Sequence, residues 1–474
     1  MLAVIFSVTF CLCFYLQRIC KIDYFLSFFA KILLGVSAVM GLVTVFAWGV
    51  DFPYLDSWAD IYLYRAPLQF TSFMLSTGGH VIILPRLVLY LLGNLTAWNT
   101  IYFLAFQWLM SVLLALGVTW FLRKSTGSLS LSPLILLTIG LAVSPNTVNF
   151  YLDNRLQSHI MCFPLFFFAV FLFGRSKWWL RNLAAPAVCF LATFTSGWGI
   201  LIWFAFAPAI LISALQKRRF FSVIVWSGFA VISFLIFLNL FTSGYGKSEF
   251  ITLRAVALGL IDFVLMVGVL FFNAPLNGGA NLVNVGILIM TGCVLCGLQC
   301  FVIFRTIKNI GALAWLTNTI GITTIYCVFA GLMATIGRAE FYPFSGLGMR
   351  YVNVAIVFVA VLIAHCLVLA RARSIDAEIM SLIKIGLVSI IIASYPVASF
   401  YAFKKASEFH RDAASAVRCV RSENPYEDFS CYERVYSDID LPERQQSFVM
   451  AIDYMKKHHL SAFRYSKNIN LQSI

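Results

Sequence analysis

Three observations predict an all-α polytopic membrane protein. The chain of 474 residues is 61% hydrophobic and 16% aromatic, with a mean hydropathy of +0.89. Only 11% of its residues are charged, whereas soluble domains carry about 25%. The apolar residues fall in many stretches of roughly 17–25 residues, the length that an α-helix needs to cross the hydrocarbon of a bilayer. This pattern excludes a soluble globular domain, a disordered chain, a coiled coil and a small disulfide scaffold.

Charge divides the chain into a membrane body, residues 1–403, and a polar tail, residues 404–474. The tail holds 11 Lys/Arg and 10 Asp/Glu in 71 residues, and the body holds 23 Lys/Arg and 10 Asp/Glu. Almost all of the net charge of +14 therefore belongs to the body. The positive-inside rule explains this excess better than nucleic-acid binding does, so no nucleic-acid partner is expected.

The apolar stretches predict a bundle of about 11–12 transmembrane helices. The candidate spans are Phe25–Val50, Thr100–Leu122, Leu131–Ser144, Ser158–Phe173, Asn182–Leu215, Phe220–Phe241, Leu282–Phe304, Gly311–Thr335, Tyr351–Ala370 and Met380–Phe403. Asn182–Leu215 is long enough for two short helices that meet near Ser196, whereas a single crossing would place basic loops on both sides of the membrane. Leu2–Leu16 lacks a basic n-region and a cleavage site, so it is expected to be a retained helix.

Lysine and arginine indicate the orientation. Sixteen of the 23 cations of the body lie in one set of alternate loops or near the adjoining helix ends, which are expected to be cytoplasmic. The other loops hold seven of the ten body acids, so the long loop 51–99 and the tail 404–474 are expected on the outer side. This assignment of the loops places both ends of Ala255–Phe272 on the outer side, so the segment is predicted to be re-entrant or interfacial. Val81–Leu95 is predicted to lie at the outer interface.

Two cysteines stand apart from the other ten, which lie in apolar stretches. Cys419 and Cys431 are the only cysteines of the tail, and eleven residues lie between them. Because the tail is expected to face an oxidising compartment, we predict a disulfide between them; the alternative is two free thiols in a cytoplasmic tail. Cys293-Val-Leu-Cys296 lies in a membrane helix with no nearby His or acid, so it is expected to hold inert thiols and no metal.

The first outer loop carries the candidate catalytic residues. Asp51, Asp56 and His80 lie on one membrane face together with Arg86. Asp56 is either the N-cap of a helix that begins at Ser57 or the general base of a membrane-surface active site. His80 and Asp51 are the further candidates for the base, and Asp51 at the end of a span is alternatively a cap at the membrane boundary.

Arginines on the outer side suggest a phosphate site. A guanidinium in the apolar segment around Arg86 requires an anionic partner, and a lipid phosphate is the obvious one. Arg338 and Arg350 are outer cations of the same kind, although Arg338 is also placed to pair with Glu340. Outer aromatic residues such as Trp58 are placed either to stack on a sugar ring or to form the usual interfacial belt.

Several segments together resemble the GT-C superfamily of polytopic glycosyltransferases, in particular the phage-type, serotype-converting glucosyltransferases that modify bacterial O-antigen. The segments are Asp56-Ser-Trp58, Gly79-His80 followed by Leu84-Pro85-Arg86-Leu87, Ser196-Gly197-Trp198-Gly199, Phe272-Asn-Ala-Pro275, Gly337-Arg338-Ala-Glu-Phe341 ending in Arg350-Tyr351, and Tyr454 to Phe463. They cover most of the chain in order, and each motif is short.

The resemblance implies a hexosyltransferase of the bacterial inner membrane whose active site faces the periplasm. It implies a polyprenyl-phosphate sugar as donor and a lipid-linked or surface glycan as acceptor, with Asp56 as the base. Trp58, Arg86, Arg338, Arg350 and Tyr351 then bind substrate. The donor carries no nucleotide, so no cofactor is expected; a polyprenyl-phosphate sugar synthase, a flippase and membrane lipids are the expected partners.

Two other classes of function remain open from the sequence. A transporter or lipid-sugar flippase typically shows inverted repeats and ionisable groups at the midplane. The sequence shows no internal repeat, and Asp262 and His365 are the main ionisable groups within its apolar stretches. An outer-face acyl- or phosphotransferase would use the same loop residues as the glycosyltransferase.

Overall fold

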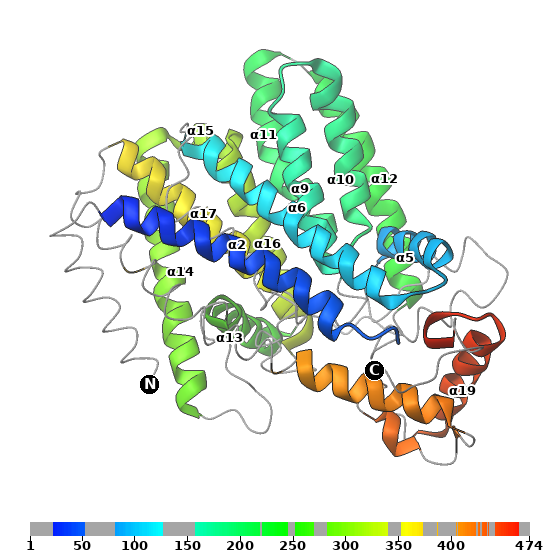
Figure 1. The fold of residues 1–474 in the computed structure, drawn as a ribbon. Coiled ribbons are helices and arrows are strands. Elements are labelled where there is room, and N and C mark those ends of the chain that lie inside the picture. The colour runs from blue at the N-terminus through cyan, green and yellow to red at the C-terminus, as the bar shows by residue number, and fades with distance from the viewer. Residues whose placement is uncertain are drawn as a thin grey trace.

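The computed structural model describes residues 22–52, 81–126, 157–218, 220–244, 252–269, 282–339, 352–372, 386 and, with short gaps, 404–463. The regular secondary structure of these residues is entirely helical (Figure 1). Six of the described helices are long and apolar enough to cross a membrane. The chain is therefore an α-helical protein with the character of a multi-pass membrane protein.

The helices of the body follow one another with short 3₁₀ and π turns between some of them. They are α2 (Ile22–Trp48), α5 (Ile83–Thr96), α6 (Thr100–Thr126), α9 (Gln157–Phe173), η3 (Leu180–Ala184), α10 (Ala185–Thr193), η4 (Gly197–Leu201), α11 (Ile202–Lys217), α12 (Phe220–Gly244), α13 (Leu253–Val269), α14 (Leu282–Ile310), α15 (Ala312–Thr317), α16 (Thr319–Ala339) and α17 (Val352–Arg371). The tail contains a helix over 406–421, η7 (Phe429–Tyr432), α19 (Pro442–Lys457) and η8 (Ser461–Phe463). The predicted helices Leu2–Leu16, Leu131–Ser144 and Met380–Phe403 lie outside the described residues.

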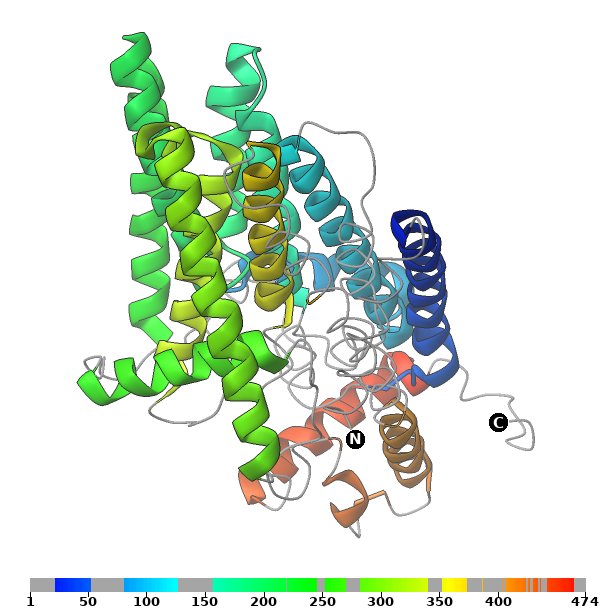
Figure 2. The same ribbon diagram turned by 90° about the vertical axis from the view of Figure 1, so that its left-hand side faces the viewer.

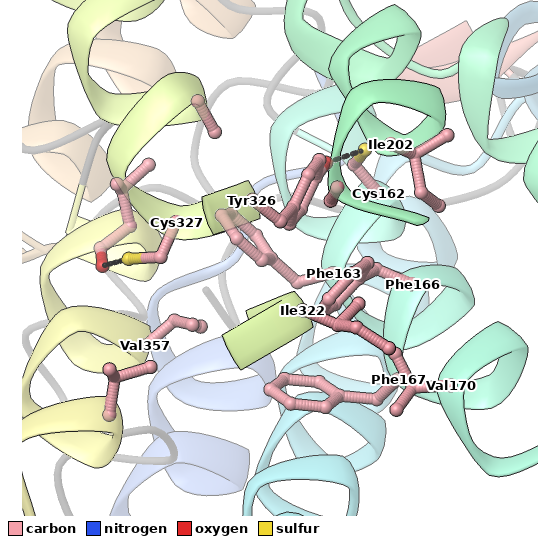
Figure 3. Close-up of a cluster of buried hydrophobic side chains, with 14 of the residues drawn as sticks. Cys162, Phe163, Phe166, Phe167, Val170, Ile202, Ile322, Tyr326, Cys327 and Val357 are labelled. Atoms are coloured by element: carbon pink, nitrogen blue, oxygen red, sulfur yellow. Dashed lines mark hydrogen bonds between the residues drawn. The ribbon is translucent and has the colours of Figure 1, made fainter. Parts of the chain in front are cut away.

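The core of the bundle lies where α9, α16 and α17 meet (Figure 3). The ring of Tyr326 stacks on Phe166 with centroids 4.2 Å apart and meets Phe163 edge-on at 5.7 Å. Its hydroxyl lies 2.8 Å from the sulfur of Cys162, so the one polar atom of this ring has a partner. Every side chain from Asn353 to Cys366 is buried, which is typical of a helix surrounded by protein on all sides.

The stretch Asn182–Leu215 forms a helical hairpin, as predicted. The descending arm is η3 with α10, and the returning arm is η4 with α11, with a non-helical turn centred on Ser196 between them. Arg181, near the start of the first arm, donates a hydrogen bond of 2.9 Å from Nη2 to Ser213 near the end of the second. The basic loops on either side of the hairpin therefore lie at the same end, which excludes a single crossing.

Helix α13 does not run alongside the other long helices but lies across them (Figures 1 and 2). It crosses α14 and α16 at close range because glycines occupy the crossing points: Gly259 faces Ile336, and Gly292 faces Val264. Asp262 is 2% exposed, so protein surrounds its carboxyl group. This placement agrees with the predicted re-entrant or interfacial helix and places the acid against protein.

The predicted span Gly311–Thr335 is wrong in one respect, because it is broken into α15 and α16. Asn318 has extended backbone, and its side-chain oxygen accepts a 2.9 Å hydrogen bond from the amide of Gly321. This is the geometry of an Asn N-cap, which satisfies one of the free amides at the start of α16. The sequence signal was the polar pair Asn318-Thr319 inside an apolar stretch.

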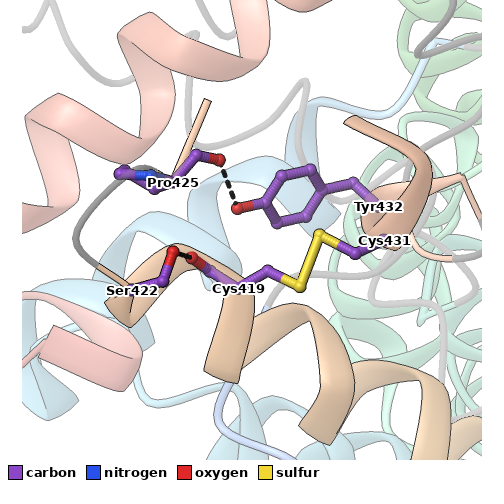
Figure 4. Close-up of a disulfide and its surroundings, with 5 residues drawn as sticks. All are labelled: Cys419, Ser422, Pro425, Cys431 and Tyr432. Carbon is purple, nitrogen blue, oxygen red and sulfur yellow. Dashed lines mark hydrogen bonds between the residues drawn. A yellow bond between two sulfur atoms is a disulfide. The ribbon is translucent and has the colours of Figure 1, made fainter. Parts of the chain in front are cut away.

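The tail folds into a small helical unit whose hydrophobic core also includes Phe52, Leu89, Trp98 and Phe103 of the body. Cys419 and Cys431 are joined by a disulfide, with their Cα atoms 6.7 Å apart, as the sequence predicts (Figure 4). Beside it, the buried Tyr432 donates a 2.8 Å hydrogen bond to the carbonyl of Pro425. The disulfide thus connects the end of helix 406–421 to η7, and the ring of Phe448 from α19 packs on Tyr432.

Candidate functional site

The candidate site lies at the end of the bundle where α2 ends and α6 begins, which we call the α5 end. Helix α5 follows directly after the loop that carries Asp56 and His80, and it packs against α6 and α9. Its buried face consists of Pro85, Arg86, Leu89 and Gly93. These positions follow helical spacing, so one face of α5 is covered by protein.

Arg86 is the largest side chain of the described residues that has no exposed surface. An arginine keeps its positive charge in proteins, so α5 holds a permanent cation away from water. Burying such a charge is costly unless anionic or hydrogen-bonding groups surround it. Because Arg86 lies on the buried face of α5, the packing of this helix determines where its guanidinium group lies.

The start of α5 is attached to the turn of the hairpin. The amide of Leu84 donates a 3.1 Å hydrogen bond to the carbonyl of Phe194, in the turn that follows α10. Two segments far apart in the sequence, Leu84-Pro85-Arg86-Leu87 and Ser196-Gly197-Trp198-Gly199, thereby come together. Neither the spacing nor the composition of the sequence shows that they meet.

The hairpin turn is tightly packed and contains buried hydroxyl groups. Thr195 donates a 2.7 Å hydrogen bond to the carbonyl of Ala192, and the indole of Trp203 donates one of 2.9 Å to the hydroxyl of Thr193. Ser196 and Thr195 have no exposed surface. These local bonds hold the backbone of the turn in place where α5 is attached.

Asp51 serves as a structural anchor at this end of the bundle. Its carboxylate accepts a 3.0 Å hydrogen bond from the amide of Thr100, the first residue of α6. A carboxylate at this position satisfies a free amide and is favoured by the helix dipole. The hydroxyl of Thr100 in turn donates a 2.7 Å hydrogen bond to the carbonyl of Val50. The geometry therefore supports the boundary-cap interpretation of Asp51, one of its two predicted roles.

The tail also docks at the α5 end. The hydroxyl of Ser461 donates hydrogen bonds of 2.8 Å and 3.3 Å to the carbonyl and carboxylate oxygens of Asp51, and its amide donates one of 3.0 Å to Ala97. At the other end of the tail, Nδ1 of His410 lies 3.3 Å from the carbonyl of Trp48. The tail is thus attached to the ends of α2 and α5 at two separate points.

The remaining predicted site residues are not placed by the structure. Asp56, Trp58, His80, Arg350 and Tyr351 lie outside the described residues. Arg338 occupies the last part of α16, and its side chain also lies outside them. The structure therefore brings together Asp51 and the segment of Arg86 at one end of the bundle and leaves the proximity of the others open.

His365, an ionisable group within an apolar stretch, has a structural arrangement. Its Nε2 accepts a 3.1 Å hydrogen bond from the indole of Trp315, and its Nδ1 lies 2.9 Å from the carbonyl of Val361. Because the indole can only donate, Nε2 must accept, and the ring proton then belongs on Nδ1. The neutral ring satisfies both partners, so this histidine links α15 to α17.

Among the described residues, no group of three or more His, Cys, Asp and Glu is placed to hold a metal ion. No family model, no curated protein and no solved structure matches this chain.

Proposed function

We propose that this chain transfers a sugar from a polyprenyl-phosphate donor to a cell-surface glycan, such as O-antigen, at the outer face of the bacterial inner membrane. The bundle would then be of the GT-C type, with the α5 end and the tail in the periplasm. The observation that carries the proposal is Arg86: a fully buried cation on α5, directly after the loop with Asp56.

In the proposed reaction a hydroxyl of the acceptor glycan attacks the anomeric carbon of the donor. Asp56 takes the hydroxyl proton, the bond from the anomeric carbon to the phosphate oxygen breaks, and the polyprenyl phosphate leaves. This single displacement inverts the anomeric centre and requires one carboxylate near the acceptor. Arg86, Arg338 and Arg350 stabilise the phosphate, because the guanidinium fork matches phosphate oxygens.

The attachment of α5 to the hairpin turn supports this assignment. A leaving phosphate is stabilised best by a cation whose position is fixed before the reaction. The bond from Leu84 to Phe194 and the buried face of α5 fix the backbone that carries Arg86. Trp58 and Tyr351 are proposed to contact the sugar and carrier.

The alternatives are a lipid-sugar flippase and an outer-face acyl- or phosphotransferase. A flippase coupled to protons would require titrating groups inside the bundle. His365 is unsuited to that role, because its neutral form already satisfies Trp315 and Val361. The outer-face transferases use the same cations, and only the identity of the transferred group separates them from a glycosyltransferase.

The decisive experiment is Asp56→Asn, assayed for sugar transfer in membranes supplied with polyprenyl-phosphate hexoses. We expect a rate loss of about 10²–10⁴ with unchanged expression and donor binding, the usual contribution of a general base. Glu249→Gln, another outer acid, is the matched control and should retain activity. Near-normal transfer by Asp56→Asn would contradict the assignment, and transfer of an acyl or phosphoryl group by the wild type would favour the alternative.

A further inference from the structure

We propose that the end of the bundle opposite α5 binds the headgroup of an anionic phospholipid. The site is formed by the loop between α9 and η3 and by the junction of α11 and α12, and we call it the basic end. This proposal does not depend on the transferase assignment.

Two contacts join these segments into one surface. Arg181 of η3 donates its 2.9 Å hydrogen bond to Ser213 of α11. The ring of Trp178, before η3, stacks on Phe221 of α12 with centroids 5.8 Å apart. Segments about forty residues apart in the sequence therefore form a common face.

Arg175 and Lys177 of the basic end have no acidic residue near them in the sequence. The sequence contains no Asp or Glu between residues 154 and 248. Arg175 and Lys177 are exposed, so their charge is available to an anion from outside the protein.

Aromatic rings orient two of the guanidinium groups. The guanidinium carbon of Arg175 lies 3.9 Å from the ring centroid of Phe171, and that of Arg181 lies 4.5 Å from that of Phe173. Each ring engages its guanidinium at close range as a cation–π partner. The side chain of Arg175 is also exposed, so its guanidinium can reach phosphate oxygens and donate charge-assisted hydrogen bonds to them.

Exposed aromatic side chains beside these cations favour a lipid over a soluble anion. Trp178 and Trp179 are 42% and 54% exposed, and Phe220 and Phe221 are 58% and 60% exposed. Tryptophan prefers the boundary between headgroups and acyl chains. Apolar rings next to cations match a phospholipid, whose acyl chains contact the rings while its phosphate contacts Arg175 and Lys177.

The test compares phospholipids of different charge on the purified full-length protein in detergent. The probes are phosphatidylglycerol, phosphatidylcholine and inorganic phosphate, and the readouts are bound lipid by native mass spectrometry and the thermal unfolding midpoint. We expect phosphatidylglycerol to bind and raise the midpoint, and phosphatidylcholine and phosphate to have little effect. The double variant Arg175→Gln with Lys177→Gln should bind phosphatidylglycerol roughly 10- to 30-fold more weakly, as expected for two cations at a membrane surface.

The matched control removes the same charge elsewhere. Arg305→Gln with Lys308→Gln, at the end of α14, should bind phosphatidylglycerol within about twofold of the wild type. Equal losses in both double variants would overturn the proposal, because they would indicate general attraction to a positive surface. Unchanged binding in the Arg175 and Lys177 variant, or equal stabilisation by inorganic phosphate, would overturn it as well. Midpoints measured in phosphatidylcholine confirm that both variants are folded.

Discussion

Ser461 donates a 2.8 Å hydrogen bond to the backbone carbonyl of Asp51, although the two residues are 410 positions apart in the sequence. The carboxylate of the same aspartate accepts a hydrogen bond from the amide of Thr100, the first residue of α6. The end of α2, the start of α6 and the last described turn of the tail are therefore connected through one residue. Asp56 follows this point by five residues in the sequence, so the tail helps to fix the position of the described residues that precede it.

Asp51 is predicted to act through its oxygen atoms as acceptors and not as a base. Asp51→Asn keeps an oxygen that can accept from Thr100 and should retain most of the stability and any transferase activity. Asp51→Ala removes the acceptor and should destabilise the protein by about 1–2 kcal/mol, as other lost helix caps do. Thermal unfolding in detergent, together with sugar transfer in membranes, checks both variants. A loss of 10²-fold or more in Asp51→Asn, with an unchanged unfolding midpoint, would instead make Asp51 a base.

Much of the bundle could be predicted because hydrophobic length and charge act locally. The hairpin was predictable since Asn182–Leu215 is too long for one short helix and has basic residues on both sides. The re-entrant or interfacial character of α13 was predicted because the distribution of basic loops places both ends of Ala255–Phe272 on the same side of the membrane. The break at Asn318 was missed because one Asn–Thr pair barely changes the hydrophobicity of a long window, although it caps a helix.

The construction of the α5 end could not be predicted from the sequence. Ala97, Trp98 and Ser461 all have positive φ, with values of 49°, 59° and 49°. Residues with a side chain rarely adopt this conformation, and no glycine marks the turn. The contact of Ser461 with Asp51 depends on this backbone and on packing between distant segments, which local patterns do not encode.

The hairpin predicts that both of its basic loops are accessible from the same side of the membrane. Ser176→Cys and Gln216→Cys each add a thiol at an exposed position beside these loops. A membrane-impermeant maleimide should label both variants under the same condition, and in the orientation proposed above only after the membrane is permeabilised, with wild-type labelling as the background. If one thiol reacts in intact cells and the other only after permeabilisation, the hairpin does not return to its starting side.

Tyr426 predicts a loss of tail stability at high pH. Burial, followed by the 2.6 Å hydrogen bond to Asp453, raises the pKa of Tyr426 above its ordinary value. An unfolded tyrosine has a pKa of about 10, so between that pH and the higher folded pKa the native state binds more protons. Stability is therefore fully present below about pH 10 and decreases as the pH rises further.

Tyr426→Phe is the control for this effect, because it removes the titrating hydroxyl while lysine side chains, which ordinarily titrate in the same pH range, are retained. Protease resistance of the tail, measured without thiol reagents between pH 8 and 11, should fall less steeply in Tyr426→Phe than in the wild type. Identical pH profiles would assign the alkaline loss to other groups.

Gly199 is predicted to be essential for the hairpin turn that holds α5. A Cβ atom at this position would overlap the carbonyl oxygen of Ala192 and lie 2.9 Å from that of Thr193, and neither backbone oxygen can move without opening the turn. Gly199→Ala should therefore destabilise the protein by about 1–3 kcal/mol, the usual cost of overpacking.

Gly228→Ala on α12 is the matched control, since a Cβ there has no other atom within 4 Å, and alanine favours a helix. Thermal unfolding followed by tryptophan fluorescence should show a lower midpoint for Gly199→Ala alone. The carbonyl of Phe194 in the same turn accepts the hydrogen bond from the amide of Leu84, so protease should also cut near α5 more readily in Gly199→Ala. Equal midpoints for the two alanine variants would mean that the turn relaxes without cost and does not fix the position of Arg86.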